Sequence, residues 1–205
     1  PWYDVKGTLR AKTFDSVFGF SSSVLSPAKL SGAGYLGFYL ADTSEGQKSW
    51  FYIPGQRRIR PAPDFSYDMP MNGSILWDEI AGFHGRMDRF DFKLTGKTEM
   101  LVPYNIFGVT NTIQSKDYLG KKFVNPDAVR WERHRVWVVD AVRKPDAKHM
   151  FSRRTLYVDE DCWCVTQVDA YNDAGEIARV THVNNFPSYA TGGINVNSWT
   201  FYDLV

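Results

Sequence analysis

The stretch RRTLYVDEDCWCVTQVDAYNDAGEIARV, residues 153–180, decides the fold class of this 205-residue chain. Apolar, β-branched and aromatic residues recur in it, which is typical of strands in half-buried sheets. Three strand-like segments lie in and around it, at residues 150–158, 162–171 and 176–183. The polar connections between them, residues 159–161 and 172–175, are typical of tight turns. The stretch therefore predicts three antiparallel strands in succession.

The same strand signals extend in both directions from this stretch. Toward the N-terminus, Pro54-Gly55 separates two apolar segments and predicts a hairpin turn. Gly96-Lys97 predicts another turn, because apolar and polar residues alternate on both sides of it. The predicted strands outside the central stretch are residues 35–40, 48–53, 57–60, 90–95, 98–104, 129–143 and 194–204.

Residues 74–81, SILWDEIA, are the best candidate for a helix, which Gly82 would end. A helix of only about two turns depends on packing against other elements. About ten short strands joined by hairpins remain, and this spacing indicates an antiparallel meander that forms a sandwich or a barrel. We expect a mainly β protein built as a single domain over residues 1–205, since all-β domains often reach this length.

The composition is rich in aromatic residues, with 14 Phe, 11 Tyr and 7 Trp. Such rings fill the core of a β protein. Where there are more rings than the core can hold, the remaining rings line a pocket. The net charge of +1 is too balanced for a nucleic-acid-binding surface. No apolar run reaches the length of a transmembrane helix. The chain begins at Pro1-Trp2 without a visible signal peptide, so we expect a processed product or part of a longer precursor.

No motif for catalysis or metal binding is recognisable. The histidines are His84, His134, His149 and His182. None has a second histidine or a carboxylate motif at metal-ligand spacing, and Glu132 beside His134 is the nearest approach. The acidic residues 159–161 lack the alternating oxygen ligands of a Ca²⁺ loop. No glycine-rich loop opens a helix to bind phosphate. We therefore expect no enzyme, no cofactor and no metal.

Two further groups of residues have alternative readings. Cys162 and Cys164 lie in a predicted strand, where a bond between them would distort the ladder, so we expect two free thiols. Arginines cluster at residues 57–60, 130–135 and 153–154. Cross-strand pairing with acidic residues explains them; a basic rim that meets an anionic headgroup or membrane surface also explains them, with Arg58, Arg60 and Arg135 as its candidates.

Several long stretches resemble one bacterial family, domain of unknown function 1329. They are Arg58-Ile59-Arg60-Pro61, Trp77-Asp78 with Gly82 and Gly85, residues 88–105, residues 132–144 and residues 153–180. The resemblance implies the fold of the periplasmic lipoprotein-localisation carriers (LolA- and LolB-like proteins), in which an incomplete, open antiparallel barrel surrounds short helices and leaves an apolar cavity. It also implies a location in the periplasm or at the outer-membrane periphery of a Gram-negative bacterium. No catalytic residue of the family is known that would transfer to this chain.

Residues and resemblance together predict a non-catalytic carrier that shelters a lipid-like or other hydrophobic molecule. The candidate residues of its apolar wall are Phe38, Trp50, Tyr52, Phe92, Tyr104, Trp137, Val139 and Trp163, and core packing is an equally good explanation for each. One alternative is an envelope assembly protein whose exposed rings dock a membrane transporter. The other is a hydrolase, which requires His134 or His182 to meet a carboxylate and a hydroxyl.

Overall fold

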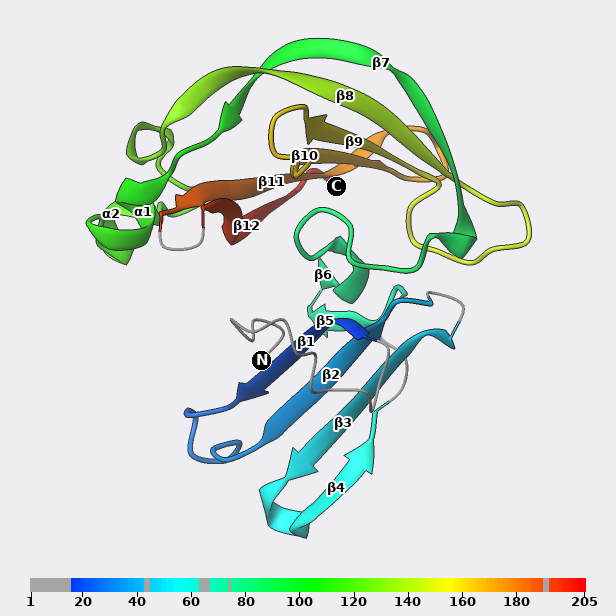
Figure 1. The fold of residues 1–205 in the computed structure, drawn as a ribbon, viewed down its shortest axis with the longest axis vertical. Helices are drawn as coiled ribbons and strands as arrows, with labels where there is room; N and C mark the ends of the chain where they lie inside the picture. The colour runs from blue at the N-terminus through cyan, green and yellow to red at the C-terminus, as the bar shows by residue number, and fades with distance from the viewer. Residues whose placement is uncertain (1–15, 43–44, 63–66, 74, 190–191) are drawn as a thin grey trace, which may run out of the picture. The chain divides into compact units, whose positions relative to one another are not determined.

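The computed structural model describes residues 16–42, 45–62, 67–73, 75–189 and 192–205. The chain divides into two compact units, Pro1–Tyr67 and Asp68–Val205, which are described separately below. Both consist mainly of antiparallel strands with few short helices, which confirms the predicted fold class (Figure 1). The single-domain organisation of residues 1–205 stays a prediction.

The first unit contains a four-stranded antiparallel sheet in the order β1-β2-β3-β4. Its strands are β1 (Ser16–Ser23), β2 (Gly34–Leu40), β3 (Gln47–Ile53) and β4 (Arg58–Pro61). A 3-10 helix, Pro54–Gln56, turns the chain from β3 into β4, and Arg57 after it adopts a left-handed conformation with φ 49°. The hairpin predicted around Pro54-Gly55 is therefore confirmed.

The second unit contains a six-stranded antiparallel sheet in the order β12-β11-β10-β9-β8-β7. Its strands are β7 (Phe90–Pro103), β8 (Trp131–Arg143), β9 (Arg153–Asp159), β10 (Val165–Tyr171), β11 (Ile177–Ser188) and β12 (Gly193–Asp203). Every strand pairs with its neighbour in sequence, so this sheet is the predicted meander.

One predicted hairpin is wrong. Residues 90–95 and 98–104 were expected to be two strands joined at Gly96-Lys97, whereas β7 runs through both segments without a turn. The register against β8 shifts between Leu94 and Gly96, so the glycine marks a bulge in a long strand. Both halves of β7 pair with β8, and a turn would have left half of β8 without this partner.

The six-stranded sheet is strongly curled. Figure 1 shows β7 and β8 as a long pair that arches over the shorter strands β9 to β12. The segment after β7 reaches the far part of the sheet, where the amide of Ile106 donates to the carbonyl of Asn185 on β11 over 3.4 Å. Three strands separate β7 from β11 in the sheet order, so this contact requires the curvature of a half-barrel.

The predicted helix at 74–81 is wrong in extent. The structure has β6 (Ile75–Leu76), paired with β5 (Pro70–Asn72), and then a single 3-10 turn, Trp77–Glu79; residue 74 lies outside the described residues. Glu79 Oε2 accepts the amide of Leu76 over 2.8 Å, and Ala81 and Gly82 have positive φ angles of 52° and 91°. These conformations end the helix after one turn.

Short helices occupy the loops of the second unit. They are α1 (Phe107–Asn111), α2 (Ser115–Tyr118) and the 3-10 turns Met87–Arg89 and Pro126–Ala128. The segment 75–90 packs on the sheet, where Phe90 and Phe83 meet Ala141, Leu156 and Val168 in the apolar core. Within the described part of the chain, no helix has the length and apolarity needed to cross a bilayer.

Candidate functional site

One side of the four-stranded sheet is lined by apolar side chains. Strand alternation and register place Gly34, Leu36 and Phe38 of β2 beside Trp50 and Tyr52 of β3. Ile59 of β4 follows, paired with Tyr52. We call this set of six residues the apolar face. Leu36, Tyr52 and Ile59 are 40%, 39% and 69% exposed, and such a cluster on an open sheet indicates a binding surface rather than a core.

A hollow of about 470 Å³ lies against the apolar face. Its lining residues are Ser22, Gly34, Tyr35, Leu36, Phe38, Trp50, Phe51, Tyr52 and Ile59. Phe38 and Trp50 form one wall, with ring centroids 6.1 Å apart in an edge-to-face arrangement. Gly34 contributes no side chain to the wall, and this keeps space open between the neighbouring strands. Three of the predicted wall residues, Phe38, Trp50 and Tyr52, therefore share one hollow.

Two arginines of the predicted basic rim lie on the edge strand of this sheet. Arg58 and Arg60 pair in register with Ile53 and Phe51, so alternation places them on the side opposite Ile59 and the apolar face. The third arginine, Arg135, lies in the second unit and forms an ion pair with Glu160.

Four of the remaining wall candidates share one side of the six-stranded sheet. Phe92, Trp137 and Val139 lie on the same side by the register of β7 and β8. Trp163, in the turn after β9, stacks on Trp137 with ring centroids 6.2 Å apart. Lys97 Nζ lies 3.8 Å from the Trp137 ring centroid, a cation–π contact. Trp163 remains 71% exposed, so this pair forms a small aromatic surface.

Tyr104, the last wall candidate, has a different position. It is buried, and its ring packs against the imidazole of His134 at a tilt of 32°, with centroids 4.1 Å apart. A separate hollow of about 520 Å³ lies nearby, lined by Asn105, Ile106, Phe107, Gly108, Val109, Ala128, Arg130, Pro187 and Tyr189. Tyr104 does not line this hollow; it covers His134.

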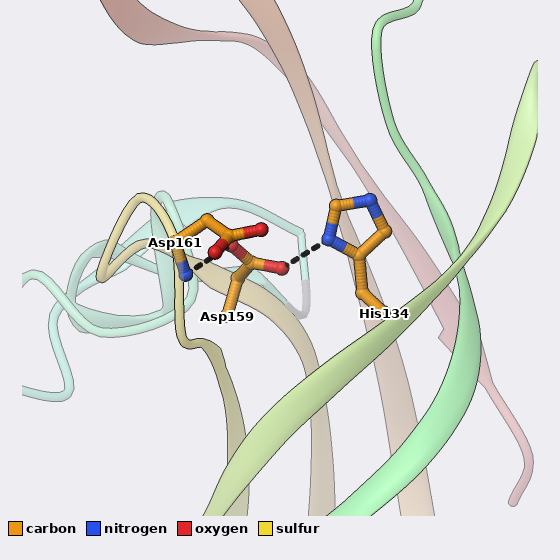
Figure 2. A group of neighbouring side chains, drawn as sticks. All are labelled: His134, Asp159 and Asp161. Atoms are coloured by element: carbon orange, nitrogen blue, oxygen red, sulfur yellow. Dashed lines mark hydrogen bonds and ion pairs between the residues drawn. The ribbon is translucent and has the colours of Figure 1, made fainter.

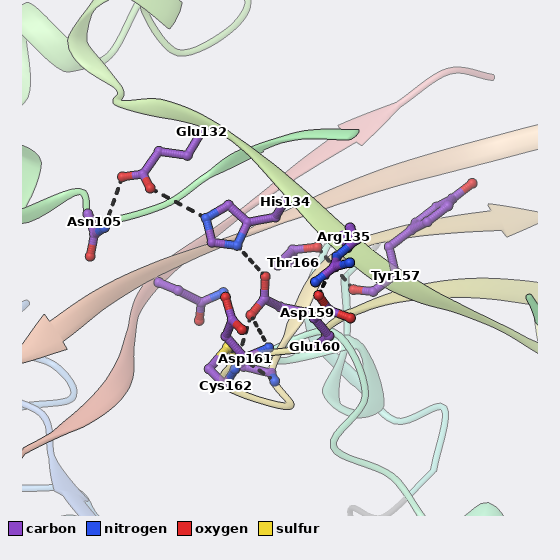
Figure 3. A network of polar contacts seen from close by, with 12 residues as sticks. Asn105, Glu132, His134, Arg135, Tyr157, Asp159, Glu160, Asp161, Cys162 and Thr166 are labelled. Carbon is purple, nitrogen blue, oxygen red and sulfur yellow. Dashed lines mark hydrogen bonds and ion pairs between the residues drawn. A yellow bond between two sulfur atoms is a disulfide. The ribbon is translucent and has the colours of Figure 1, made fainter. Parts of the chain in front are cut away.

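His134 is the centre of a polar network that connects β8, the end of β9 and the turn after it (Figures 2 and 3). Its Nδ1 donates to Asp159 Oδ2 over 2.6 Å, and its Nε2 lies 3.4 Å from Glu132 Oε2. Asp159 is fully buried, and its other oxygen, Oδ1, accepts the amides of Asp161 and Cys162, each over 3.0 Å. Backbone and imidazole together therefore fix the orientation of the Asp159 carboxylate.

The outer part of the network holds Glu132 in place. Asn105 Nδ2 donates to Glu132 Oε1 over 2.9 Å, and Arg130 Nε lies 2.6 Å from the same oxygen. The surroundings of His134 are negative: burial and the charges of Asp159 and Asp161 raise the pKa of Tyr104 to about 12. The network thus concentrates carboxylates around one imidazole.

The two cysteines form a disulfide, which corrects the expectation of free thiols. Their Cα atoms are 5.2 Å apart, because the residues lie in the turn between β9 and β10 rather than in a strand. Trp163 between them has φ 56°, and this left-handed conformation brings the two side chains to the same side. The predicted strand began three residues too early.

The His134 network was missed by the sequence analysis. Only Glu132 was considered as a partner of His134, since the two are two residues apart on one strand. Asp159 is 25 positions away, and it comes close because β8 and β9 pair with Val136 opposite Asp159. The sequence predicts residues 159–161 only as a tight turn without the ligands of a Ca²⁺ loop. Knowledge of the register between β8 and β9 would have shown that His134 and the acidic residues 159–161 lie close together.

Comparisons with known proteins agree on family and fold. The model of a family described as "Protein of unknown function (DUF1329)" matches residues 2–205. An uncharacterized protein of Pseudomonas aeruginosa is 35% identical over 178 residues, covering 84% of this chain and 39% of that protein. A domain from Vibrio parahaemolyticus, described as an outer membrane lipoprotein-sorting protein domain, superposes with a TM-score of 0.56 and 11% identity, covering 90% of this chain and 63% of that chain.

A crystal structure of a DUF1329 family protein from Desulfovibrio piger has a TM-score of 0.54 and 14% identity, covering 89% of this chain and 63% of that chain. The chain therefore spans less than two thirds of the length of each of these three proteins. At such low sequence identities the two solved structures are evidence for the fold alone. They confirm an antiparallel, half-barrel fold of the lipoprotein-sorting type.

Proposed function

The chain belongs to the DUF1329 family of proteins of unknown function, and we propose from its fold and its apolar face that it is a non-catalytic carrier for a hydrophobic, lipid-like molecule. The lipoprotein-sorting type of fold suggests a role in carrying or sorting lipid. The observation that carries the proposal is the hollow of about 470 Å³ on the four-stranded sheet, walled by Phe38, Trp50 and Tyr52.

The hollow suits an apolar guest in size and chemistry. Its volume of about 470 Å³ lies within the range of roughly 300–1,000 Å³ that is usual for small-molecule sites. Aromatic and aliphatic side chains form most of the wall, and an apolar guest needs no directed hydrogen bonds. Each methylene removed from water contributes about 0.8 kcal/mol, so an acyl chain offsets the ordering costs of binding after a modest number of carbons.

A hydrolase is less well supported. His134 does meet a carboxylate, that of Asp159, and its ring packs against the ring of Tyr104. However, Asp159 is 0% exposed and Tyr104 is 6% exposed, and a phenol with a pKa raised to about 12 is a poor nucleophile. These groups support a structural or ion-binding role for the network instead.

The finer assignments follow from the carrier proposal. We place the protein in the periplasm or at the outer-membrane periphery, where a soluble carrier of lipid-like cargo is needed. Arg58 and Arg60 lie on the side opposite the apolar face, so they are proposed to meet the anionic headgroups of a membrane surface rather than the headgroup of the bound guest. Arg135 is proposed for the same role and would have to exchange its partner Glu160. Phe92, Val139 and the Trp137–Trp163 pair are proposed as a second apolar contact. An envelope transporter is the partner to which such a carrier would deliver its cargo.

Filling the hollow tests the proposal. Gly34 allows this, because a Cβ built on it meets only Ser22 O and Tyr52 Cβ, each at an ordinary 3.7 Å. We would titrate the full chain and Gly34→Leu with a fluorescent long-chain fatty acid, and record native mass spectra of freshly purified protein. Leu30→Gln is the matched control, since Leu30 is an exposed leucine outside the hollow.

The carrier proposal predicts that wild type and Leu30→Gln bind the probe equally, whereas Gly34→Leu binds it at least about tenfold more weakly, or about 1.4 kcal/mol. Absence of any bound or extractable apolar molecule in folded wild type would overturn the proposal. If Gly34→Leu bound the probe with the same affinity as wild type, the guest would bind elsewhere than at the apolar face. Recovery of a membrane transporter with protein that binds no probe would favour the assembly function.

A further inference from the structure

We propose that His134, Asp159 and Asp161 form a binding site for a divalent transition-metal ion, with Zn²⁺ as the best fit. One ligand atom of each of the three residues lies within 4.8 Å of those of the other two (Figure 2). The site is independent of the apolar face, because it lies in the second compact unit. It adds an ion-dependent property to a carrier fold.

The ligands come from elements that hold them rigidly. His134 lies in the middle of β8, and Asp159 ends β9, which pairs with β8. Asp159 Oδ1 is occupied by the amides of Asp161 and Cys162, so Oδ2 is directed at the imidazole. Asp161 follows in the tight turn that the Cys162–Cys164 disulfide closes on its other side. A site on paired strands and a cross-linked turn is largely formed before the ion arrives.

The second nitrogen of His134 has the partner expected of a metal ligand. Ligating histidines usually donate their other ring N–H to a carboxylate, which fixes the tautomer and the ring orientation. Glu132 Oε2 is in that position, 3.4 Å from His134 Nε2. Asn105 Nδ2 donates to the other oxygen of Glu132 (Figure 3), and Arg130 forms an ion pair with the same oxygen. This arrangement leaves Nδ1, the atom that faces Asp159, as the ligating nitrogen.

The charge balance is an independent indication of a cation. The Asp161 carboxylate accepts no hydrogen bond and forms no ion pair with any residue that the structure describes, although it lies beside the carboxylate of Asp159. The nearby cations of this turn are already engaged: Arg135 and Lys97 both pair with Glu160. Two neighbouring carboxylates beside one imidazole leave negative charge that a divalent ion would neutralise.

The donor set selects the class of ion. Ca²⁺ and Mg²⁺ prefer oxygen ligands alone, whereas one imidazole nitrogen with two carboxylate oxygens suits Zn²⁺ and similar ions. Two ligands on a tetrahedral Zn²⁺ lie about 3.4 Å apart, from metal–ligand distances near 2.1 Å. The 2.6 Å between His134 Nδ1 and Asp159 Oδ2 is that of a hydrogen bond, so the ion replaces the shared proton and the ring moves outward. A fourth position stays open to water.

The test measures Zn²⁺ binding by the chelator-stripped full chain without reductant, so that the disulfide keeps the cysteines out of coordination. Affinity is obtained by competition with a chromophoric chelator, and Co²⁺ absorption reports a nitrogen–oxygen ligand set. The variants are Asp161→Asn, His134→Gln, Glu132→Gln and the Cys162→Ser/Cys164→Ser pair. The matched control is Asp146→Asn, an exposed aspartate of the β8–β9 connection.

One Zn²⁺ per chain is expected in wild type, in Asp146→Asn and in the cysteine variant. Asp161→Asn and His134→Gln are expected to weaken binding at least about tenfold, and Glu132→Gln by about tenfold, as outer partners do. Asp161 is exposed, so its variant keeps the fold, which thermal unfolding verifies. The proposal is overturned by unchanged affinity in folded Asp161→Asn, or by wild type that binds no Zn²⁺, in which case His134 and Asp159 form a structural ion pair only.

Discussion

Arg154 Nη2 donates to Asp78 Oδ2 over 2.6 Å, although the two residues are 76 positions apart in the chain. Both side chains are buried, at 1% and 3% exposure. His149 Nε2 lies 3.0 Å from the same oxygen, and the neighbouring pair Arg179–Glu79 is equally buried. These contacts hold the segment 75–90 against the six-stranded sheet, and Phe83 and Phe90 lie over the Arg154 guanidinium.

Asp78→Asn is therefore expected to destabilise the protein strongly. Removing one partner of a buried ion pair leaves an uncompensated charge and costs about 3–5 kcal/mol, here on Arg154. Glu79→Gln is the matched control with a smaller expected loss, because Arg179 keeps a second carboxylate, Asp203, 2.6 Å from its Nε. Urea unfolding at pH 7 measures both. Equal losses of unfolding free energy in the two variants would contradict this, because they would show that Asp203 does not compensate for the loss of Glu79.

Acid should reduce the difference between wild type and Asp78→Asn. Burial raises the pKa of Asp78, but the hydrogen bond from His149 and the charge of Arg154 outweigh it and hold the pKa below 3.8. A carboxyl with a lowered pKa in the folded state stabilises it above the unfolded pKa and loses this effect as the pH falls through the folded value. Unfolding free energies from pH 7 to pH 3 should converge below pH 4. Parallel curves would contradict this assignment.

Much of the fold could be predicted from the sequence because it depends on local signals. Short apolar segments and the turn at Pro54-Gly55 define β2, β3 and β4 almost to the residue. The errors arose where tertiary contacts override local signals. Gly96 is a turn residue by propensity, but continued pairing with β8 makes it a bulge. The helix expected at 74–81 gives way because the buried arginines of the sheet draw in Asp78 and Glu79.

The candidate sites were predictable to different degrees. Phe38, Trp50 and Tyr52 are three of the eight predicted wall residues, and they share one hollow because they lie on consecutive strands; their contact with a ligand stays a prediction. The His134 network depends on residues 25 positions apart whose meeting requires the register of two strands. Register is a property of the pair and cannot be derived from either strand alone. The prediction of two free thiols failed for a similar reason, because the pairing of the cysteines depends on where β9 ends and β10 begins.

His182 is expected to make the protein less stable in mild acid. Burial lowers the pKa of His182 below 6.5, against a smaller opposing effect of Asp169, and its ring packs edge-on against Trp131 and Tyr202. A neutral, half-buried histidine with a lowered pKa stabilises the fold above the unfolded pKa, and this contribution falls as the pH drops below about 6.5. In His182→Gln the unfolding free energy should depend less on pH between 7 and 5. If the unfolding free energy of His182→Gln depended on pH as steeply as that of wild type, other groups would cause the acid sensitivity.

The disulfide closes a very short loop, and its loss should cost little stability. For a loop of three residues the chain-entropy relation gives about 1–2 kcal/mol at most. Wild type should react with maleimide only after reduction and then at two thiols. The Cys162→Ser/Cys164→Ser variant should also lose near-ultraviolet circular dichroism, because the turn positions Trp163 on Trp137. Trp163→Ala should lose the same signal while keeping the disulfide. Maleimide labelling before reduction would contradict the pairing.

Gly82 should be among the least replaceable residues of the chain. It has φ +91°, and a Cβ there would lie 2.5 Å from Val165 Cγ1 and 2.8 Å from Val165 Cβ. Gly82→Ala therefore combines left-handed strain of about 1–2 kcal/mol with overpacking of about 1–3 kcal/mol. Gly175→Ala is the matched control, since Gly175 has φ +79° but nothing within 4 Å of its Cβ, so only the strain remains.

The two contributions to the Gly82→Ala loss can be separated by a double-mutant cycle with Val165→Ala. Truncating Val165 removes the methyl carbon that the new Cβ meets at 2.5 Å but leaves its own Cβ at 2.8 Å. The loss of unfolding free energy in the double variant should therefore be smaller than the sum of the two single losses. It should still be larger than the loss in Gly175→Ala. Strict additivity of the unfolding free energies would mean that Gly82 does not pack on β10, and that the segment 75–90 is held to the sheet by its buried ion pairs and by the packing of Phe83 and Phe90.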